Sequence, residues 1–266
     1  MMRIDPITRA KFARFRAMRR GYWSALILGA LMLLSLCAEL FVNSRALIVV
    51  YQGTWHFPTY GAVIPGTVFG ENYAYETNYR DLKGRFQAAN QGDWVVMPLI
   101  PFNPLEINTY DGEFAPHPPN AGRDHYLGTD VAGRDVAARL VYGFRIAIWF
   151  SMALLLSTYV IGIGLGCWMG YRGGWVDLGI QRLIEIWSNV PFLYVIMIVA
   201  SIVTPGFGLL VSLMVLFGWM GMTWYMRTAT YKEAARDYVL AARALGASPT
   251  RIIVRHILPN TVSIIV

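Results

Sequence analysis

The chain has 266 residues, of which 56% are hydrophobic, and its mean hydropathy is +0.42. This composition excludes an ordinary soluble globular protein. The formal net charge is +7, but no basic patch is interleaved with stacking aromatic residues, so the charge does not indicate nucleic-acid binding. It is explained instead by basic segments that flank long apolar runs.

Four long apolar runs dominate the sequence, and only the first contains a charged residue, Glu39. Each is about 18–24 residues long, which is enough for a helix to cross a hydrocarbon core of roughly 30 Å. The runs predict an all-α membrane protein with spans at 22–42, 146–169, 186–203 and 207–226.

Basic residues predict the orientation of these spans. The N-terminal segment 1–21 carries Arg3, Arg9, Lys11, Arg14, Arg16, Arg19 and Arg20. The positive-inside rule therefore places the N-terminus in the cytoplasm of a multi-pass membrane protein. Alternation then places 43–145 outside and the basic segment 227–260 inside.

Residues 43–145 form a connection much longer than a hairpin loop. The segment is rich in aromatic residues, which a disordered linker would lack. We expect a small, ordered extracytoplasmic cap, with extended coil around the proline clusters of its second half and an amphipathic lead-in to the second span.

The cap ends in a polar run that includes Asp124, His125, Asp130 and Asp135. Its spacing matches no strong metal-ligand pattern, so a metal site is disfavoured. A turn at Gly128 followed by a helix cap at Thr129 or Asp130 explains the same residues.

The second and third spans carry packing signals. Gly162, Gly166 and Gly170 are four residues apart and share one helical face, so another helix can approach them closely. Arg182 and Glu185 have the i,i+3 spacing of an interfacial ion pair. Pro191 is expected to kink the third span.

The most distinctive segment lies at 227–260. Ala234, Tyr238, Ala241 and Leu245 form one helical stripe. Gly246 suits the left-handed position that ends a helix, and Ser248 with Pro249 suits the start of another. That second helix carries Arg251 and Arg255 and is expected to end at Leu258-Pro259. A basic amphipathic loop on anionic lipid would explain the arginines but not these turn signals.

This segment resembles the EAA loop of ABC importer permeases, in which an E-A-A-x-x-x-G core precedes I-x-L-P. Aligned on Gly246 and Leu258-Pro259, the family's E-A-A falls at 240–242, so Leu240 replaces Glu and His256 replaces Ile. The literal Glu-Ala-Ala at 233–235 is out of register. The resemblance assigns contact with the ATPase to Tyr238, Leu240, Ala241, Ala242, Arg243, Leu245, Gly246, Ala247, Ser248, Arg251, Arg255, His256, Leu258 and Pro259.

Two further motifs are similar to the dipeptide/oligopeptide/nickel branch of these permeases. One is Leu-Gly-Thr-Asp-x-x-Gly-Arg-Asp at 127–135, and the other is Tyr-x-Gly-Gly-x-x-Asp at 171–177. Their family-motif residues are Gly128, Thr129, Asp130, Gly133, Arg134, Asp135, Gly173, Gly174 and Asp177. The long insertion before His125 resembles the Yej-type permeases of importers for oligopeptides and the peptide antibiotic microcin C.

The resemblance implies a type I, MetI-like helix bundle with an insertion after its first span. A full-length member would have six spans, so 261–266 would begin a fifth span and the C-terminal spans would be missing. The helix at 238–250 would couple to a separate ATPase subunit that hydrolyses ATP-Mg. A second permease subunit, a periplasmic substrate-binding protein and a peptide substrate would complete the importer.

The chain contains no G-x-x-x-x-G-K-[ST] loop, so it is expected to bind no ATP, to need no cofactor of its own and to be no enzyme. Two alternatives stay open. A secondary transporter or channel would show charges or broken helices at mid-membrane depth. A membrane-anchored enzyme would place its chemistry among His56, His117 and His125 in the cap.

Overall fold

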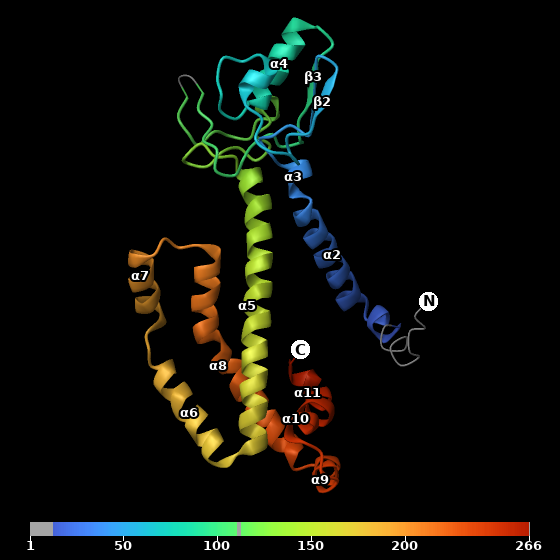
Figure 1. Ribbon diagram of the computed structural model, residues 1–266, viewed down its shortest axis with the longest axis vertical. Helices are drawn as coiled ribbons and strands as arrows, with labels where there is room; N and C mark the ends of the chain where they lie inside the picture. The colour runs from blue at the N-terminus through green and yellow to red at the C-terminus, as the bar shows by residue number, and fades with distance from the viewer. Residues whose placement is uncertain (1–12, 111–112, 266) are drawn as a thin grey trace. The chain divides into compact units, whose positions relative to one another are not determined.

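The computed structural model describes residues 13–110 and 113–265 of this chain. The chain is mostly helical and divides into two compact units, one ending at Ile148 and the other beginning at Trp149 (Figure 1). Part of the predicted basic N-terminus, including Arg3, Arg9 and Lys11, lies outside the described residues.

The first unit begins with helix α2 (Arg19–Leu36), which is followed after Cys37 by the short α3 (Ala38–Phe41). Together they occupy the predicted first span. The Ser35 hydroxyl donates a hydrogen bond to the Met32 carbonyl, close to the residue at which the helix is interrupted. Because α2 starts with two arginines, it is not among the described helices that are long and apolar enough to cross a membrane, and its role as a span stays a prediction.

The cap contains a small antiparallel sheet, so the prediction of an all-α protein is wrong here. Its strands are β1 (Ile48–Tyr51), β2 (Thr54–His56) and β3 (Trp94–Val96), in the order β2-β1-β3. Val49 pairs with His56 on one side and with Val95 on the other. The β-branched residues of β1 favour a strand over a helix. A strand of four residues is too short to produce the kind of long apolar run from which the all-α prediction was made.

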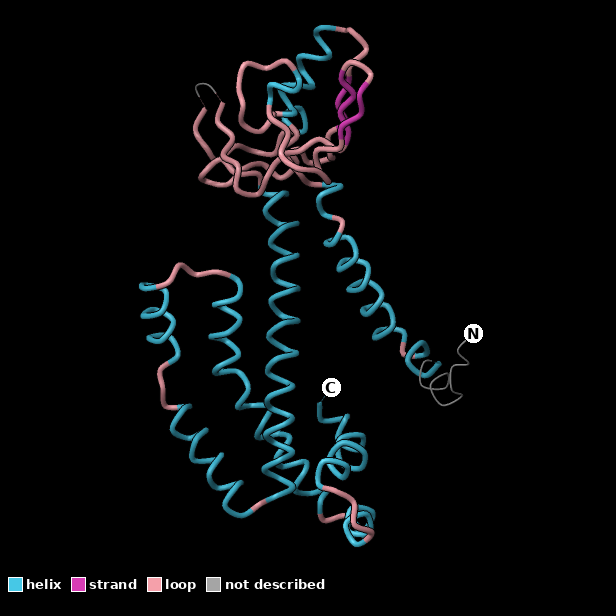
Figure 2. The backbone as a smooth tube through the Cα atoms, viewed as in Figure 1, coloured by secondary structure: helices cyan, strands magenta, loops and turns pink. Residues whose placement is uncertain are grey.

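One helix covers this sheet and supplies much of the cap's core. Helix α4 (Tyr79–Ala89) begins at Asn78, whose side chain accepts hydrogen bonds from two backbone N–H groups of its first turn. Two 3₁₀ turns, η1 (Gly66–Phe69) and η2 (Ala121–Arg123), complete the regular structure. The buried core comprises Ala46, Val49, Phe69, Tyr79, Leu82, Phe86 and Val95. Between β3 and η2 the described residues form turns and loops, as the prolines predict (Figure 2).

The second unit is a set of long helices. Helix α5 (Val136–Arg172) begins in the first unit and continues into this one, and α8 (Phe207–Ala234) follows later in the chain. These two are the helices among the described residues that are long and apolar enough to cross a membrane; a bent pair, α6 and α7, would be a third.

The bent pair corrects the predicted third span. Helix α6 (Gly174–Ser188) and helix α7 (Phe192–Ile202) meet at 67°, so the run 186–203 is broken rather than kinked. Pro191 has no N–H to donate to the Trp187 carbonyl four residues earlier, which accepts from the Val190 N–H at 3.1 Å instead, and the Asn189 side chain donates to the Glu185 carbonyl at 2.6 Å. A single span would therefore have to combine both helices, beginning near Gly174.

The predicted glycine face brings α5 against α8. A Cβ atom placed on Gly162, Gly166 or Gly170 would lie 2.7 Å or closer to an atom of α8. Gly164, two residues from Gly166, faces open space. The three glycines therefore permit the close approach of two apolar helices, as their spacing predicts.

The chain then turns through α9 (Asp237–Ala244), α10 (Pro249–Ile252), a π-helical segment (Ile253–Ile257) and α11 (Leu258–Ile265). Pro259 was expected to end the second helix, but it lies in the first turn of α11. Pro259 has no N–H to donate, and the wider π-helical turn before it changes the hydrogen-bonding register at this point. The chain is thus helical from Pro249 to Ile265.

Candidate coupling elbow and its supporting motifs

The segment 237–260, called the elbow from here on, is a compact set of short helices at the end of α8. The backbone becomes extended at Arg236 (ψ 145°), and α9 starts at the next residue. Asp237 lies in the first turn, and Arg243 lies in the last, so each side chain has the charge that complements the helix dipole. The segment 227–260, which is predicted to be cytoplasmic, therefore starts inside α8 and includes the last two turns of that helix.

The turn between α9 and α10 has the geometry that its sequence predicts. Gly246 adopts φ +77°. Its N–H donates to the Arg243 carbonyl at 3.0 Å, and the Ala247 N–H donates to the Ala242 carbonyl at 3.1 Å. These two bonds form a Schellman motif. The Ser248 side chain then accepts from the Arg251 N–H, and Pro249 occupies the first turn of α10.

The elbow has a hydrophobic core of its own. Val239 and Ala242 of α9 are buried against Ile252 and Ile257, and Tyr171 at the end of α5 packs on this cluster. The Arg243 guanidinium lies over the Tyr171 ring at 5.0 Å. Of the predicted coupling residues, Ala242 is therefore part of this core, while Ala247, His256 and Leu258 are half-buried.

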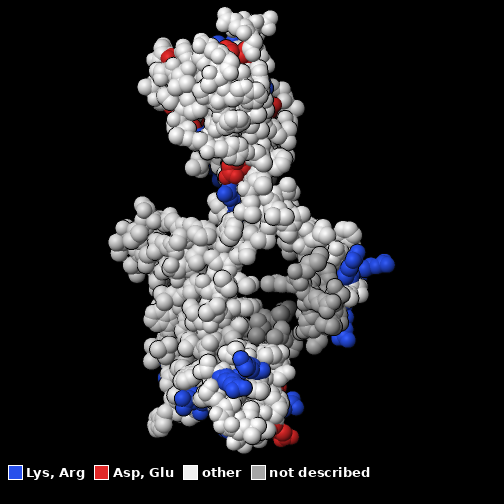
Figure 3. All heavy atoms as spheres, turned by 45° about the vertical axis from the view of Figure 1, so that its right-hand side comes forward, with Lys and Arg blue, Asp and Glu red and all other residues white. Residues whose placement is uncertain are grey.

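The opposite face of α9 is exposed. Tyr238, Ala241 and Leu245 of the predicted stripe face solvent, together with Leu240, and the Leu245 side chain is 88% exposed. Arg243, Arg251 and Arg255 are exposed around them. Figure 3 shows Lys and Arg gathered at the elbow end of the second unit, with an uncharged surface along the helices above it. The exposed surface of the elbow thus consists of leucines surrounded by arginines.

One hydrogen-bond network ties α9 to the helices before and after it. The Tyr238 hydroxyl donates to Glu233 Oε2 at 2.6 Å, and Asn260 Nδ2 donates to the Tyr238 oxygen at 3.0 Å and to the His256 carbonyl at 2.8 Å. Partial burial, together with the bond to the Glu233 carboxylate, raises the pKa of Tyr238. Glu233 belongs to the out-of-register Glu-Ala-Ala, and its role here was not predicted from the sequence.

The 127–135 motif forms a tight loop ahead of α5. Gly128 (φ +74°) and Gly133 (φ +79°) each lie so close to a neighbouring carbonyl that a Cβ would be 2.6 Å or less from it. Asp130 Oδ1 accepts from the N–H groups of Ala132 and Arg134, and its Oδ2 accepts from Arg134 Nε at 2.9 Å. Although desolvation opposes ionisation, these hydrogen bonds and the charge of Arg134 hold the pKa of Asp130 well below its usual range.

Asp135, not Thr129 or Asp130, is the residue that caps α5. Its Oδ1 accepts from the Ala138 N–H at 2.7 Å, and its Oδ2 lies 2.7 Å from His125 Nδ1. Both side chains are buried, and His125 stacks on Phe102. The Thr129 hydroxyl instead accepts from the His117 N–H. The sequence prediction placed the cap a few residues too early because the loop folds back before the helix starts.

The histidines of the cap each have a partner close by among the described residues. Within 13–110 and 113–265, no three His, Cys, Asp or Glu side chains are placed to hold one metal ion. His56 packs on Phe69, His117 lies 3.5 Å from Glu113, and His125 pairs with Asp135. In the described part of the chain, none of these three rings is hydrogen-bonded to a Ser or Cys side chain.

The Gly-Gly-x-x-Asp motif joins α5, α6 and α8. Gly173 (φ +61°) and Gly174 (φ +54°) make the reversal between α5 and α6. Asp177, in the first turn of α6, then forms a bidentate ion pair with Arg227 of α8, with distances of 2.5 and 2.6 Å. Arg227 is the first residue of the basic segment 227–260, which predicts a cytoplasmic location, and nothing in its sequence context identifies Asp177 as its partner.

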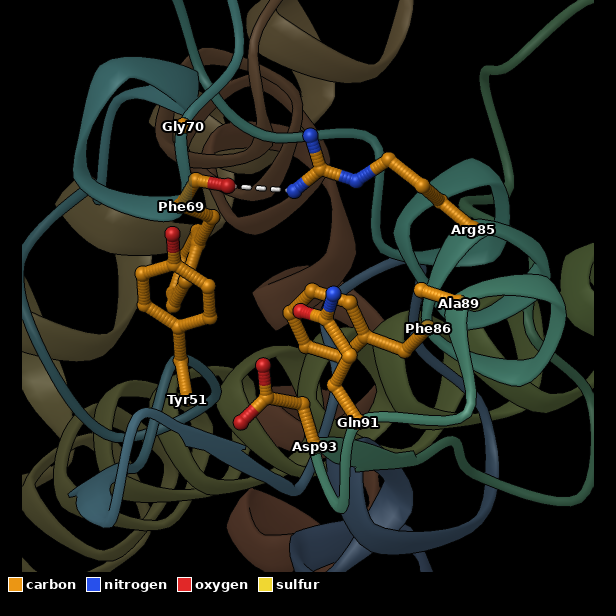
Figure 4. Close-up of a pocket in the computed structure, with 8 residues that line it drawn as sticks. All are labelled: Tyr51, Phe69, Gly70, Arg85, Phe86, Ala89, Gln91 and Asp93. Carbon is orange, nitrogen blue, oxygen red and sulfur yellow. Dashed lines mark hydrogen bonds between the residues drawn. The ribbon is translucent and has the colours of Figure 1, made fainter.

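The cap also contains a cavity of about 240 Å³, shown in Figure 4. The rings of Tyr51 and Phe86 stack along it with centroids 5.6 Å apart. Arg85 reaches across to the Phe69 carbonyl and lies 3.1 Å from Glu71, while Asp93 accepts from the Gln52 N–H. The charged side chains that line this cavity are therefore paired with other groups of the cap, and these contacts stabilise the cap.

Comparisons with known proteins show the family to which the chain belongs. Residues 162–266 match the family described as "Binding-protein-dependent transport system inner membrane component". The chain is 43% identical to the inner membrane ABC transporter permease protein YejE of Escherichia coli (strain K12), over 98% of this chain and 75% of that protein. It is 36% identical to the peptidoglycan transport system permease protein YejE of Agrobacterium fabrum (strain C58), over 96% and 72%.

Another relative matches a smaller share of the chain. The dipeptide transport system permease protein DppC of Bacillus subtilis (strain 168) is 36% identical over 56% of this chain and 46% of its own length. Members of this family are transport subunits and not enzymes. The chain belongs to the ABC transporter permeases, the inner membrane components of binding-protein-dependent transport systems.

Proposed function

We propose that this chain forms one half of the translocation pathway of an ATP-driven importer for short peptides. Three relatives are named for transport: one of dipeptides, one of oligopeptides and one of peptidoglycan, which contains peptide stems. A second, homologous permease subunit would supply the other half, since the helices described here cannot enclose a peptide-sized route alone. The cap would lie on the extracytoplasmic side and receive a peptide-loaded binding protein, and the N-terminus would be cytoplasmic.

The elbow is the proposed contact with a separate ATPase subunit, and the exposed face of α9 carries this proposal. Leu240 and Leu245 are exposed, whereas Val239 and Ala242 hold the helix to the rest of the elbow. Exposed leucines on a rigid, internally packed helix have the character of an interface centre, and the surrounding arginines that of its rim.

The elbow could transmit movement because it is anchored at both ends. The Tyr238 network connects α9 to the end of α8 and to the start of α11, and the elbow core connects it to the end of α5. A force applied to α9 by ATP-driven closure of the ATPase subunits would therefore reach three membrane-facing helices. The ATPase subunit would bind ATP-Mg, and this chain would bind no cofactor.

The proposal is tested with Leu245→Glu in the assembled importer. Because the Leu245 side chain is almost fully exposed, we expect the variant to fold and insert normally. It should lose the ATPase subunit on purification in detergent and lose peptide uptake in cells. Leu105→Glu is the matched control, because Leu105 is a comparably exposed leucine (76%) in the cap. That variant should retain the ATPase subunit.

Three results would count against the proposed function. If Leu245→Glu retains the ATPase subunit and transports peptide at the normal rate, α9 is not the coupling helix. If both glutamate variants lose the ATPase subunit, the effect does not come from the elbow. A permease that transports peptide with its ATPase gene deleted would instead point to a secondary transporter.

A further inference from the structure

The cap contains a charge-free segment with an unusual surface. Residues 46–70 include no Asp, Glu, Lys or Arg, although both flanks, at Arg45 and Glu71, are charged. Several large side chains of this segment are nevertheless exposed around an open hollow: Trp55, Phe57, Tyr60, Val63 and Val68. A contiguous apolar surface of this kind indicates an interaction site.

A tight turn fixes the two aromatic residues at the centre of this surface. The Tyr60 N–H donates to the Phe57 carbonyl at 3.2 Å, with Pro58 at the second position of the turn, where its ring geometry is favourable. Pro58 is buried. Phe57 and Tyr60 therefore project from the two ends of an anchored turn, with 50% and 65% of their surface exposed.

Hydrogen bonds place this turn beside the point where the chain leaves α3. The Thr59 hydroxyl donates to the Ala46 carbonyl at 2.8 Å, and its N–H donates to the same carbonyl at 3.2 Å. Asn43 Nδ2 donates to the Thr59 hydroxyl oxygen at 3.4 Å. Asn43 is two residues beyond Phe41, the last residue of α3. The turn is thus fixed to the first residues outside the helix.

Contacts within the first unit show which residues of α5 lie beside the end of α3. Glu39 of α3 is ion-paired with Arg145, and the Tyr142 hydroxyl donates to the Val42 carbonyl at 3.0 Å. Directly after Arg145, α5 enters its long charge-free run. Asn43 is four residues beyond Glu39, two of them past the end of α3, so it lies within roughly 10 Å of Glu39 along the chain. The Phe57–Tyr60 turn therefore lies at the height expected of the lipid headgroups.

We propose that the Phe57–Tyr60 turn rests in the bilayer interface and seats the cap on the leaflet beneath it. Aromatic side chains, Tyr and Trp above all, favour this region, where one end of the ring is apolar and the other is wet. The absence of charge from 46–70 removes the cost of desolvating ionised groups there. A lipid surface is favoured over a partner protein because the turn is bonded to the residues that emerge from the membrane. This role is separate from peptide transport.

The test measures membrane depth at single sites. Nitroxide labels are attached to Phe57→Cys or Tyr60→Cys in the full permease complex in lipid bilayers, with Cys37 and Cys167 replaced. The matched control is Gln52→Cys, on the same charge-free segment but at the far end of β1, a strand of four residues that is roughly 13 Å long. Accessibility to oxygen, which partitions into lipid, is compared with accessibility to an aqueous nickel chelate.

We expect the oxygen-to-nickel accessibility ratio at both turn positions to be several-fold higher than at Gln52, with no binding protein present. Ratios equal to that at Gln52 would overturn the proposal, because the turn would then be in water. Protection from nickel that arises only when a binding protein is added would also overturn it and assign the surface to that protein. Because both labelled residues are exposed, neither substitution removes a core contact.

Discussion

Asp177 and Arg227 form a bidentate ion pair that joins the first turn of α6 to α8, fifty positions further along the chain. Both side chains are largely shielded, and the Gln181 side chain donates a further hydrogen bond to Asp177 at 3.2 Å. The aspartate of the Gly-Gly-x-x-Asp motif thus fixes where the α5–α6 reversal lies against α8.

Removing one partner of this pair should destabilise the protein more than removing both. Asp177→Ala leaves the Arg227 charge without its acceptor, at a cost of about 1–3 kcal/mol. Asp177→Ala/Arg227→Ala removes both charges and should recover part of that loss. Thermal unfolding of the purified permease in detergent measures both. A double variant that is less stable than Asp177→Ala alone would show that the pair is not the reason for the motif.

The contact between α5 and α8 should depend on glycine at one face only. Gly166→Ala places a Cβ 2.6 Å from the Thr223 carbonyl oxygen and 2.7 Å from the Met226 Cβ, so the helices must move apart. We expect a loss of about 1–3 kcal/mol. Gly164→Ala is the control: its Cβ meets open space, and alanine favours a helix. Equal effects on thermal stability would contradict the packing interpretation.

Gly246 should be required for its backbone conformation and not for its small size. Among the residues that the structure describes, no atom beyond its two chain neighbours lies within 4 Å of a Cβ built there, but its φ of +77° is unfavourable for most side chains. Gly246→Val should therefore abolish peptide uptake while the chain still inserts into the membrane. Gly246→Asn should retain much more activity because asparagine tolerates this conformation. If the two variants transport equally, the left-handed turn is not the important feature.

The Tyr238 hydroxyl should stabilise the elbow through its two side-chain partners. Tyr238→Phe removes the bonds to Glu233 and Asn260 while keeping the ring, and should cost about 0.5–1.5 kcal/mol. Hydrogen exchange of the α9 amides should increase as the helix detaches more readily. Tyr231→Phe is the control at a more exposed tyrosine (69%). Unchanged exchange in Tyr238→Phe would show that the elbow core alone holds α9.

Asp130 should make stability depend on acidic pH. Its pKa is lower in the folded protein than in the unfolded chain, so its contribution is complete above the ordinary value of about 3.9 and is lost as the pH falls below it toward the folded pKa. The stability difference between the native protein and Asp130→Asn should therefore be constant near neutral pH and shrink below about pH 4. A difference that does not change with pH would mean that the carboxylate is not preferentially ionised in the folded loop.

The sequence alone determined the features that depend on short-range chemistry. Long charge-free runs predict α5 and α8, because a chain in lipid must satisfy its backbone hydrogen bonds within one helix. Gly246, Ser248 and Pro249 predict the turn between α9 and α10, because the preferences of these residues act over only a few positions. The spacing of Gly162, Gly166 and Gly170 likewise identified a face for close packing.

Only the tertiary structure decided which distant groups meet. It selected Val239 and Ala242 as the buried side of α9, joined Asp177 to Arg227, and gave the out-of-register Glu233 a partner in Tyr238. It also moved the cap of α5 to Asp135 and placed Pro259 inside a helix. The physical reason is the same in each case: a hydrogen bond or a packing contact between residues far apart in sequence depends on how whole helices approach, and no local pattern records that approach.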